Sequence, residues 1–282
     1  MRVLVIGSKG QLGQSLKSIA LNYAIDFIFS DRSVLDITNQ KNIKLYFKNN
    51  EFDYCVNCSA YTAVDKAEEE LELATKINVL GVSYLAEACK NSKTELIHIS
   101  TDFVFQGNSF KPYKESDVTK PISVYGKTKL EGEKIIKKTL ENHYIIRTSW
   151  LYSEFGNNFM KSMLNLSKTR KELSIINDQI GTPTYALDLA EVIIKIIEIK
   201  PLYGIYNYSN EGVATWYDFA KTIFEYAEQT VKTNPIPTTE YPTPAMRPVF
   251  SVLDKSKIKN NLQIEIPYWR DSLKNAIKNY NE

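Results

Sequence analysis

The sequence has few of the residues that build metal centres, disulfide frameworks or strongly charged surfaces. Its 282 residues include three cysteines and two histidines, and 35 Lys and Arg residues balance 33 Asp and Glu residues to a formal net charge of +2. A balance this even supplies no strong field for nucleic acid or for an anionic membrane. With two histidines and no His-x-x-His spacing, a catalytic zinc site and a Ser-His-Asp hydrolase are also disfavoured.

Long apolar runs are lacking as well. The longest, Leu189–Ile199, is interrupted by three charged residues, so it is not expected to span a bilayer. The first apolar run, Val3–Ile6, is too short for the core of a signal peptide. We therefore expect a cytoplasmic globular protein, and a composition of 43% hydrophobic and 24% charged residues is ordinary for one.

Two of the cysteines, Cys55 and Cys58, have the Cys-x-x-Cys spacing of some redox and zinc elements. Their surroundings predict a buried strand, in which residues three apart point to opposite faces and lie about 10 Å apart. A disulfide needs its Cα atoms within about 4.4 to 6.8 Å. We expect these two and Cys89 to be small buried residues.

Short apolar runs alternate with amphipathic stretches in the first half of the chain. Strands are predicted at Arg2–Ile6, Ile25–Phe29, Tyr54–Cys58, Glu95–Ser100 and Tyr144–Arg147. Helices are predicted between them at Gln11–Ala24, Asn39–Asn49, Ala67–Lys90 with a break, and Ser123–Leu140. This order indicates βαβ units and an α/β fold with a doubly wound, mostly parallel, Rossmann-like sheet.

Beyond about residue 150 the pattern loosens. Helices are predicted at Asn157–Lys168, Tyr185–Ile199 and Thr215–Gln229, separated by loops rich in Gly, Asn and Pro. Four prolines in Pro235–Pro244 predict a segment without regular secondary structure. We expect residues 151–282 to form a smaller C-terminal subdomain, from which Tyr185–Ile199 returns to cover the sheet.

Three glycines, Gly7, Gly10 and Gly13, follow the first predicted strand and open the first helix. Such glycines permit a tight turn, a close approach of the backbone to a pyrophosphate, and close packing of helix on strand. The helix N-terminus then offers free N–H groups and a positive dipole end to the phosphates. The position of the glycines between strand and helix predicts that residues 1–150 form a dinucleotide-binding domain.

Two neighbouring residues after the second predicted strand bear on the choice of cofactor. Asp31 lies where an acid binds the ribose 2′-hydroxyl of NAD, whereas Arg32 lies where an arginine accepts the 2′-phosphate of NADP. The two residues favour different cofactors, so the spacing leaves the choice between NADPH and NADH open.

Tyr125 and Lys129 lie at positions i and i+4, on one face of a predicted helix. A cation one turn away stabilises a phenolate, which favours proton donation by tyrosine at neutral pH. Taken alone, this spacing also fits a solvated lysine and a half-buried tyrosine. Ser100-Thr101-Asp102 supplies a context, because it ends the fourth predicted strand, where open α/β sheets bind ligands.

Further motifs run along most of the chain. They are Asp36-Ile37, Ala60–Glu68, Asn78–Gly81, Ser100–Phe105, Val124–Lys129, Arg147–Trp150, Asn157–Phe159, Asn177–Gln179, Gly181–Thr184 and Arg247-Pro248. With the glycine loop, they resemble the extended short-chain dehydrogenase/reductase superfamily and, within it, the dTDP-4-dehydrorhamnose reductase family. One departure is Asn57-Cys58-Ser59, which stands where relatives often have Asn-Ala-Ala.

The resemblance implies roles for individual residues. It implies that Gly10, Gln11 and Leu12 wrap the cofactor pyrophosphate, that Asp36 and Ile37 lie near the adenine, and that Ser59, Ala60 and Thr62 lead toward the nicotinamide ribose. It also implies that Tyr125 donates a proton, that Lys129 binds the ribose, and that Thr101 replaces the serine of most related reductases. Substrate contacts are implied for Asp102, Val104, Trp150, Asn158 and Arg247.

The activity that the resemblance implies is NAD(P)H-dependent reduction of the C4 keto group of dTDP-4-dehydro-L-rhamnose. A reductase or epimerase of another nucleotide sugar, and a non-catalytic regulatory subunit of the same fold, remain alternatives. The resemblance also implies Mg²⁺, for which the spacing of acidic residues indicates no site. A homodimer is common among such folds, although no stretch of the sequence marks an interface.

Overall fold

The computed structural model describes residues 1–281 and is built around one six-stranded sheet. Its strands are β1 (Arg2–Ile6), β2 (Asp26–Ser30), β3 (Tyr54–Asn57), β4 (Glu95–Thr101), β5 (His143–Thr148) and β10 (Gly204–Asn207). They lie in the order β10-β5-β4-β3-β1-β2, and every neighbouring pair is parallel. The predicted doubly wound parallel sheet is confirmed, with β10 as a strand that the sequence did not indicate.

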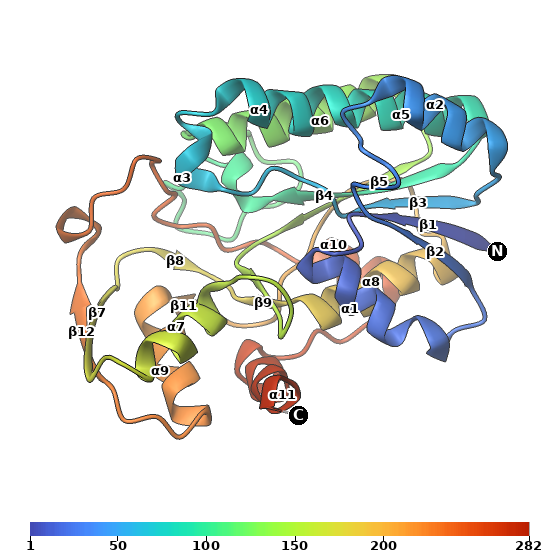
Figure 1. Ribbon diagram of the computed structural model, residues 1–282. Coiled ribbons are helices and arrows are strands. Elements are labelled where there is room, and N and C mark those ends of the chain that lie inside the picture. Colours follow the sequence, from blue (N-terminus) through green and yellow to red (C-terminus); the bar gives the residue numbers. More distant parts are fainter. Residues whose placement is uncertain (282) are drawn as a thin grey trace.

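Helices cover both faces of this sheet (Figure 1). One face carries α2 (Gln40–Asn49), α5 (Val82–Ser92) and α6 (Val124–Thr139), and the other carries α1 (Gln11–Ile19), α8 (Ala186–Ile199) and α10 (Ser256–Leu262). Val3 and Val5 of β1 pack with residues of α8, whereas Leu4 and Ile6 pack with residues of α2 and α5. Burial on both faces explains why β1 is apolar throughout instead of alternating.

The predicted long helix over Ala67–Lys90 is divided in the structure. α3 (Val64–Ala67) and α4 (Leu71–Thr75) precede a π-helical turn, Lys76–Gly81, which leads directly into α5. Asn78 in this turn is buried, and its amide hydrogen-bonds the backbone N–H and C=O of Tyr61 and the hydroxyl of Thr128. The wider turn thus ties the loop after β3 to helix α6.

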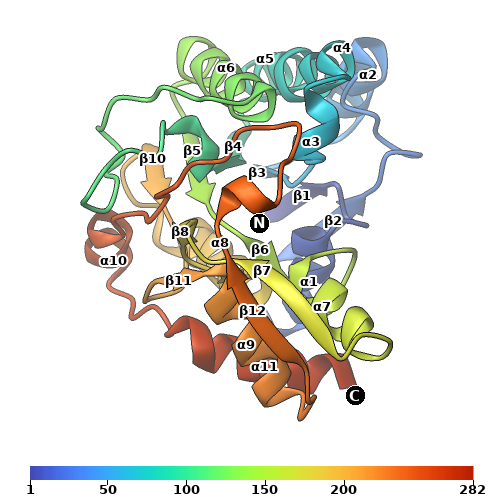
Figure 2. The same ribbon diagram turned by 90° about the vertical axis from the view of Figure 1, so that its left-hand side faces the viewer.

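The remaining elements form a second part beside the sheet, shown in Figure 2. They are β6 (Leu151–Tyr152), α7 (Phe159–Ser167), β7 (Glu172–Ile176), β8 (Ile180–Gly181), β9 (Thr184–Tyr185), β11 (Ala214–Thr215), α9 (Trp216–Tyr226), β12 (Lys232–Ile236) and α11 (Trp269–Asn281). Their strands pair only in twos, as β6–β9, β7–β12 and β8–β11. An apolar cluster around Tyr152, Phe219 and Trp269 forms the core of this part.

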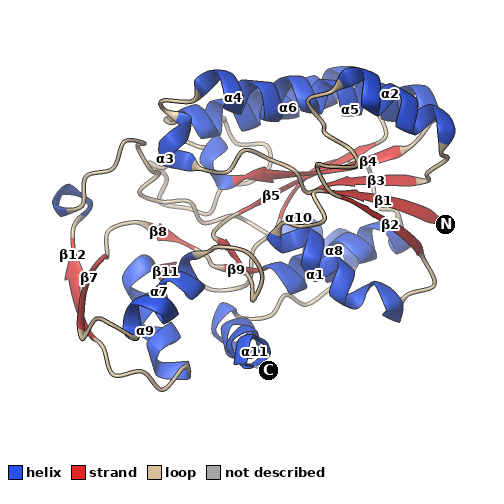
Figure 3. Cartoon of the chain, in the orientation of Figure 1, coloured by secondary structure: helices blue, strands red, loops and turns tan. Residues whose placement is uncertain are grey.

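Two expectations for the second half need comment. The segment Pro235–Pro244 is not wholly irregular, because Pro235 lies within β12 and pairs with Ile175 of β7. Proline is tolerated there because each strand of a two-stranded pair has a free edge that needs no N–H. Helix α8 covers the sheet as expected (Figure 3). The division of the chain near residue 150 stays a prediction.

Two further features concern membranes and cysteines. Within residues 1–281, no helix is long and apolar enough to cross a membrane.

Cys55 packs in the core beneath α2 and α5, while Cys58 contacts the core on the other face of the sheet. The predicted opposite orientation of these two side chains is therefore confirmed.

Candidate active site

The strand order reverses between β1 and β3, which is where open α/β sheets bind their ligands. Gly7 follows β1 there with a φ of +82°, a conformation that favours glycine. A Cβ atom on Gly7 would lie 2.9 Å from the backbone nitrogen of Ser59, which follows β3. Glycine therefore lets the two loops meet at the reversal point.

The glycine loop presents the N-terminus of α1 to this reversal point. Gly10 is the N-cap of α1 and provides no side-chain cap, so the first N–H groups of the helix are left for another acceptor. Gly10, Gln11 and Leu12 all line the main cavity described below. Gly13 does not line this cavity. A Cβ there would lie 2.5 Å from the carbonyl oxygen of Gly7, so this glycine lets α1 pack closely on the loop. The loop fits a pyrophosphate.

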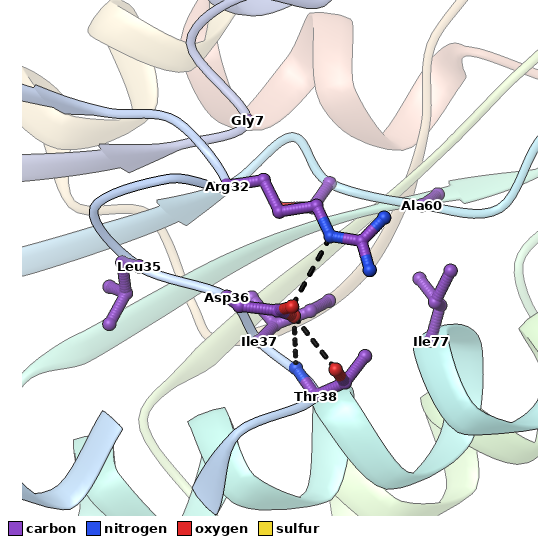
Figure 4. Close-up of a pocket in the computed structure, with 9 residues that line it drawn as sticks. Gly7, Arg32, Leu35, Asp36, Ile37, Thr38, Ala60 and Ile77 are labelled. Carbon is purple, nitrogen blue, oxygen red and sulfur yellow. Dashed lines mark hydrogen bonds and ion pairs between the residues drawn. The ribbon is translucent and has the colours of Figure 1, made fainter. Parts of the chain in front are cut away.

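A cavity of about 160 Å³ lies beside the loop after β2 (Figure 4). Its apolar walls come from Leu35, Ile37 and Ile77, and Figure 4 shows Arg32 extending across it toward Asp36. The Asp36 carboxylate accepts hydrogen bonds from Arg32 at 3.2 Å and from the backbone and hydroxyl of Thr38 at 2.9 and 2.8 Å. A small, largely apolar slot of this kind suits a flat aromatic base such as adenine.

Next to this slot lies a wider cavity of about 630 Å³, which includes Lys9, Asp31 and Arg32. The Asp31 carboxylate is already engaged by the Lys9 ammonium at 2.6 Å and by the backbone and hydroxyl of Ser33 at 2.7 and 2.5 Å. These contacts hold the pKa of Asp31 well below its usual range. Its oxygens are therefore taken. The exposed cations Lys9 and Arg32 are paired with Asp31 and Asp36, and each keeps further N–H donors for an anionic ligand group.

The main cavity, of about 590 Å³, extends from the glycine loop along the carboxyl ends of β4 and β5. Thr101, Asp102, Tyr125 and Lys129 all line it. Thr101 ends β4, and its hydroxyl donates to Asp102 at 3.0 Å. Tyr125 and Lys129 lie one turn apart on α6, a helix that begins where the Ser123 hydroxyl accepts from the N–H of Gly126. Residues predicted from two distant motifs thus meet in one cavity.

Burial shifts the pKa values of the ionisable groups in this cavity. It raises the pKa of Tyr125 to about 12; the neighbouring Asp102 adds to this increase, and a hydrogen bond with Thr101 opposes it. Burial lowers the pKa of Lys129 to about 8, against a raising effect of Glu133. It raises the pKa of Asp102 to about 6, although hydrogen bonds from Ser251 and Thr101 act against it. At pH 7 Tyr125 is therefore a neutral phenol beside a mostly protonated Lys129.

The far end of the main cavity is walled by two stacked tryptophans. The Trp150 and Trp216 rings lie 3.6 Å apart and nearly parallel, with an interplanar angle of 7°. Trp150 packs against Gly181, where a Cβ would lie 2.7 Å from the indole ring. The sequence does not predict Trp216 as a site residue, because an aromatic residue at the start of an amphipathic helix is expected to pack in the hydrophobic core.

The structure places three predicted substrate residues in different settings. Asn158 lines the cavity and donates to the side chain of Gln11 at 2.8 Å, which ties α7 to the glycine loop. Arg247 lines the cavity too, but it makes a two-point ion pair with Asp65 at 2.9 and 2.7 Å. Val104 does not face the cleft, because a 3-10 turn after β4 directs it into an apolar cluster, where it is fully buried. The expected sugar contact of Val104 therefore needs correction.

All the other predicted cofactor residues lie along the three adjoining cavities. They are Ser59, Ala60 and Thr62, together with Asp36 and Ile37. Ser59 and Ala60 border all three cavities, so the cavities form one continuous cleft. Within residues 1–281, no three His, Cys, Asp or Glu side chains are grouped so that they can hold a metal ion.

A parallel doubly wound sheet, a glycine loop at its reversal point and a Tyr-x-x-x-Lys pair in the same cleft define a short-chain dehydrogenase/reductase type of protein. The chain belongs to the RmlD substrate binding domain family, whose model matches residues 1–282.

Individual relatives agree with this assignment. The chain is 42% identical over 288 residues to a dTDP-4-dehydrorhamnose reductase of Aggregatibacter actinomycetemcomitans, with 97% of each chain covered. It is also similar to the crystal structure of a dTDP-4-dehydrorhamnose reductase of Clostridium acetobutylicum ATCC 824, with 41% identity, full coverage of both chains and a TM-score of 0.97. A third relative, the reductase of Bacillus anthracis str. Ames in complex with NADP, is 38% identical over 99% of both chains, with a TM-score of 0.96.

Proposed function

We propose that this chain is an NADPH-dependent reductase that converts the C4 keto group of dTDP-4-dehydro-L-rhamnose to the alcohol of dTDP-L-rhamnose. The observation that carries the proposal is the meeting of Thr101, Tyr125 and Lys129 with the glycine loop in one cleft. Relatives that are 42% and 41% identical over nearly their whole length are named for this reaction.

The cleft offers separate places for the parts of a dinucleotide. Gly10, Gln11 and Leu12 would hold the pyrophosphate at the N-terminus of α1, and the slot beside Asp36 and Ile37 would take the adenine. Ser59, Ala60 and Thr62 would line the path to the nicotinamide ribose. When bound, the nicotinamide supplies the hydride for the C4 carbon.

The chain's own residues would manage the proton. The partly buried Tyr125 phenol would donate its Oη proton to the oxygen forming at C4, and Lys129 on the next turn would stabilise the resulting phenolate. Thr101 would orient the C4 oxygen by turning its single hydroxyl hydrogen from Asp102 to that oxygen, while the backbone N–H of Phe103 donates to the hydroxyl oxygen. Phe103 also packs its ring edge-on against Tyr125, with ring centroids 5.6 Å apart, which restricts the phenol.

The other end of the cleft would hold the nucleotide part of the substrate. We place the sugar against Asp102 and the Trp150–Trp216 stack, and the diphosphate near Arg247. Asp65 accepts one N–H from each terminal nitrogen of Arg247, Nη1 and Nη2. Thr243 and Ala245 also accept from Nη1. The Nε–H makes none of these bonds, so Arg247 retains a donor for a phosphate oxygen while Asp65 holds it in place.

A substrate panel tests the proposal. NADPH oxidation is measured with dTDP-4-dehydro-L-rhamnose and with GDP- and UDP-linked 4-keto sugars. Turnover with the dTDP sugar supports the proposal, and turnover only with another nucleotide would replace the named substrate. The absence of any sugar-dependent oxidation, with a stoichiometric enzyme partner recovered on purification, would favour a regulatory subunit. We further propose a cytoplasmic location. We also propose a homodimer, and sedimentation velocity of the purified chain tests this oligomeric state.

The cations beside Asp31 lead to a prediction about cofactor choice. Arg32→Ala and Lys9→Ala should each raise the KM for NADPH about tenfold or more, because each removes a charge-assisted contact to the 2′-phosphate. The KM for NADH, which lacks this phosphate, should change little in Arg32→Ala and should not rise in Lys9→Ala, because loss of Lys9 frees the Asp31 carboxylate for a ribose hydroxyl. Steady-state kinetics with both cofactors measure the effect.

Lys17→Ala provides the matched control, since Lys17 is an exposed lysine of α1 outside the three cavities. It should leave both KM values unchanged. An equal rise for NADPH and NADH in the Arg32 and Lys9 variants would argue against recognition of the 2′-phosphate by these residues.

A further inference from the structure

A buried histidine lies directly behind Lys129, on the side away from the cleft. His98 is in the middle of β4 and is fully buried, and it lines none of the three cavities. Its Nε2 atom lies 3.3 Å from Nζ of Lys129, and its Nδ1 atom lies 3.1 Å from Nδ2 of Asn57 on the neighbouring strand β3. The mechanism proposed above gives this histidine no task.

The direction of each hydrogen bond in this group follows from the backbone. The N–H of Ser59 can only donate, and it donates to Oδ1 of Asn57 at 3.0 Å. The other side-chain atom of Asn57 is therefore the amide nitrogen, which donates to Nδ1 of His98. Burial lowers the pKa of His98 well below its usual value, so the ring is neutral. A neutral ring that accepts at Nδ1 carries its only hydrogen on Nε2, facing Lys129.

The neutral amine of Lys129 satisfies this arrangement and the ammonium does not. A neutral amine has two N–H donors and one lone pair. One N–H donates to the carbonyl oxygen of Ile99 at 2.6 Å, the lone pair accepts the Nε2–H of His98, and the second N–H remains for the cleft. An ammonium has no lone pair, so one of its donors would face the donor on His98.

We propose that His98 is a positioning residue for Lys129: Asn57 fixes its tautomer, and its Nε2–H favours the neutral amine of Lys129 over the ammonium. This inference rests on the proposed function for its catalytic meaning, because Lys129 stabilises the Tyr125 phenolate only while it is charged. His98 thereby lowers the upper pH limit of the reaction. It acts through Lys129 and has no contact with the cleft.

Other charges around Lys129 do not account for this effect. Glu133, one turn further along α6, raises the pKa of Lys129, and its carboxylate is paired with Arg147 of β5. Burial acts in the same direction as His98 and brings the Lys129 pKa to about 8. The ionisable and charged groups near Lys129 include His98 on β4, Tyr125 and Glu133 on α6, Arg147 on β5 and Asp102 after β4.

Two variants remove the Nε2–H by different routes. His98→Met replaces a neutral ring by a neutral side chain, and so deletes the donor without changing charge. Asn57→Asp keeps an acceptor for Ser59 and presents a second oxygen to Nδ1, which moves the ring hydrogen to Nδ1 and turns a lone pair toward Lys129. Each should raise the pKa of Lys129 by about one unit or more, the scale of one hydrogen bond.

The titration is read directly in the cofactor-free chain. The protein is labelled with [ε-¹³C]lysine, the Lys129 resonance is assigned with Lys129→Arg, and its chemical shift is followed against pH by NMR. His143→Met is the matched control, because His143 is the chain's other histidine and its Nδ1 contacts the carbonyl of Leu140 at the opposite end of the sheet. This control should leave the Lys129 midpoint unchanged.

The pH profile of kcat/KM for NADPH oxidation provides the second measurement. Activity should fall as pH rises through the Lys129 pKa, and both variants should move this alkaline limb upward. An unchanged Lys129 midpoint in His98→Met overturns the inference, because a rise in Asn57→Asp alone follows from the negative charge that this variant adds. If Lys129 titrates as described but no sugar-dependent turnover is found in any variant, the proposed function fails and the coupling of His98 to Lys129 stands.

Discussion

Tyr125→Phe should lower the turnover number for NADPH oxidation at least about a hundredfold, the scale on which a lost general acid is felt. The variant removes one oxygen atom, the atom that carries the proton for the C4 oxygen. Burial raises the pKa of this phenol to about 12, so at neutral pH the proton is present and is available for donation. Turnover at saturating substrate and cofactor is the measurement, with NADPH affinity determined separately to show that the cofactor site is intact.

The matched control is Tyr61→Phe. Tyr61 is also largely buried, but its hydroxyl donates to Glu70 at 2.7 Å and has no part in the proposed reaction. Loss of that hydroxyl should change turnover by less than about threefold, because the hydrogen bond to Glu70 lies outside the cleft. Unchanged turnover in Tyr125→Phe would remove Tyr125 from the role of proton donor.

Features that depend on short spacings could be predicted from the sequence. The glycine loop follows from three glycines between an apolar strand and a helix, and the pairing of Tyr125 with Lys129 follows from four residues of helix. The placement of Thr101 at the end of β4 adds the third member. Each of these depends on neighbours along the chain, so periodicity and position are enough.

Features that depend on contacts between distant segments could not be predicted in this way. β10 is short and half-exposed at its start, and only its pairing with β5 makes it part of the sheet. Val104 follows four residues, Ser100 to Phe103, that line the cleft, yet a 3-10 turn directs it and Phe105 inward. The contact of His98 with Lys129 joins a strand to a helix that lies 31 residues further on. The identity of a residue alone shows none of these contacts.

The choice between NADPH and NADH illustrates the same limit. In sequence, Asp31 and Arg32 are adjacent residues with opposite implications. In the structure, the Lys9 ammonium of the glycine loop lies 2.6 Å from the Asp31 carboxylate. This ion pair occupies the carboxylate that would otherwise accept a hydrogen bond from a ribose hydroxyl. The ion pair spans 22 residues of chain, and it is the contact on which the proposed preference for NADPH depends.

Glu133→Gln should lower the free energy of unfolding by about 3–5 kcal/mol, because it leaves a buried arginine without its counter-ion. Glu133 of α6 accepts two hydrogen bonds from Arg147 of β5, at 2.9 and 2.6 Å, and a third from the Ser100 hydroxyl at 2.5 Å. The Arg147 and Glu133 side chains are only 3% and 2% exposed, so water cannot replace the lost partner. Urea unfolding measures the change.

Glu131→Gln on the same helix is the matched control. Glu131 pairs with Lys134 at 2.6 Å, but the side chains of this pair are 52% and 59% exposed, so its loss should cost less than about 1 kcal/mol. A double variant, Glu133→Leu with Arg147→Met, separates the two causes of instability. If the unpaired charge causes the loss in Glu133→Gln, removing both charges should recover much of it, since apolar side chains of similar volume often replace a buried ion pair at little cost. No recovery would show instead that the hydrogen bonds of Glu133, including that to Ser100 beside Thr101, hold α6 against β4 and β5.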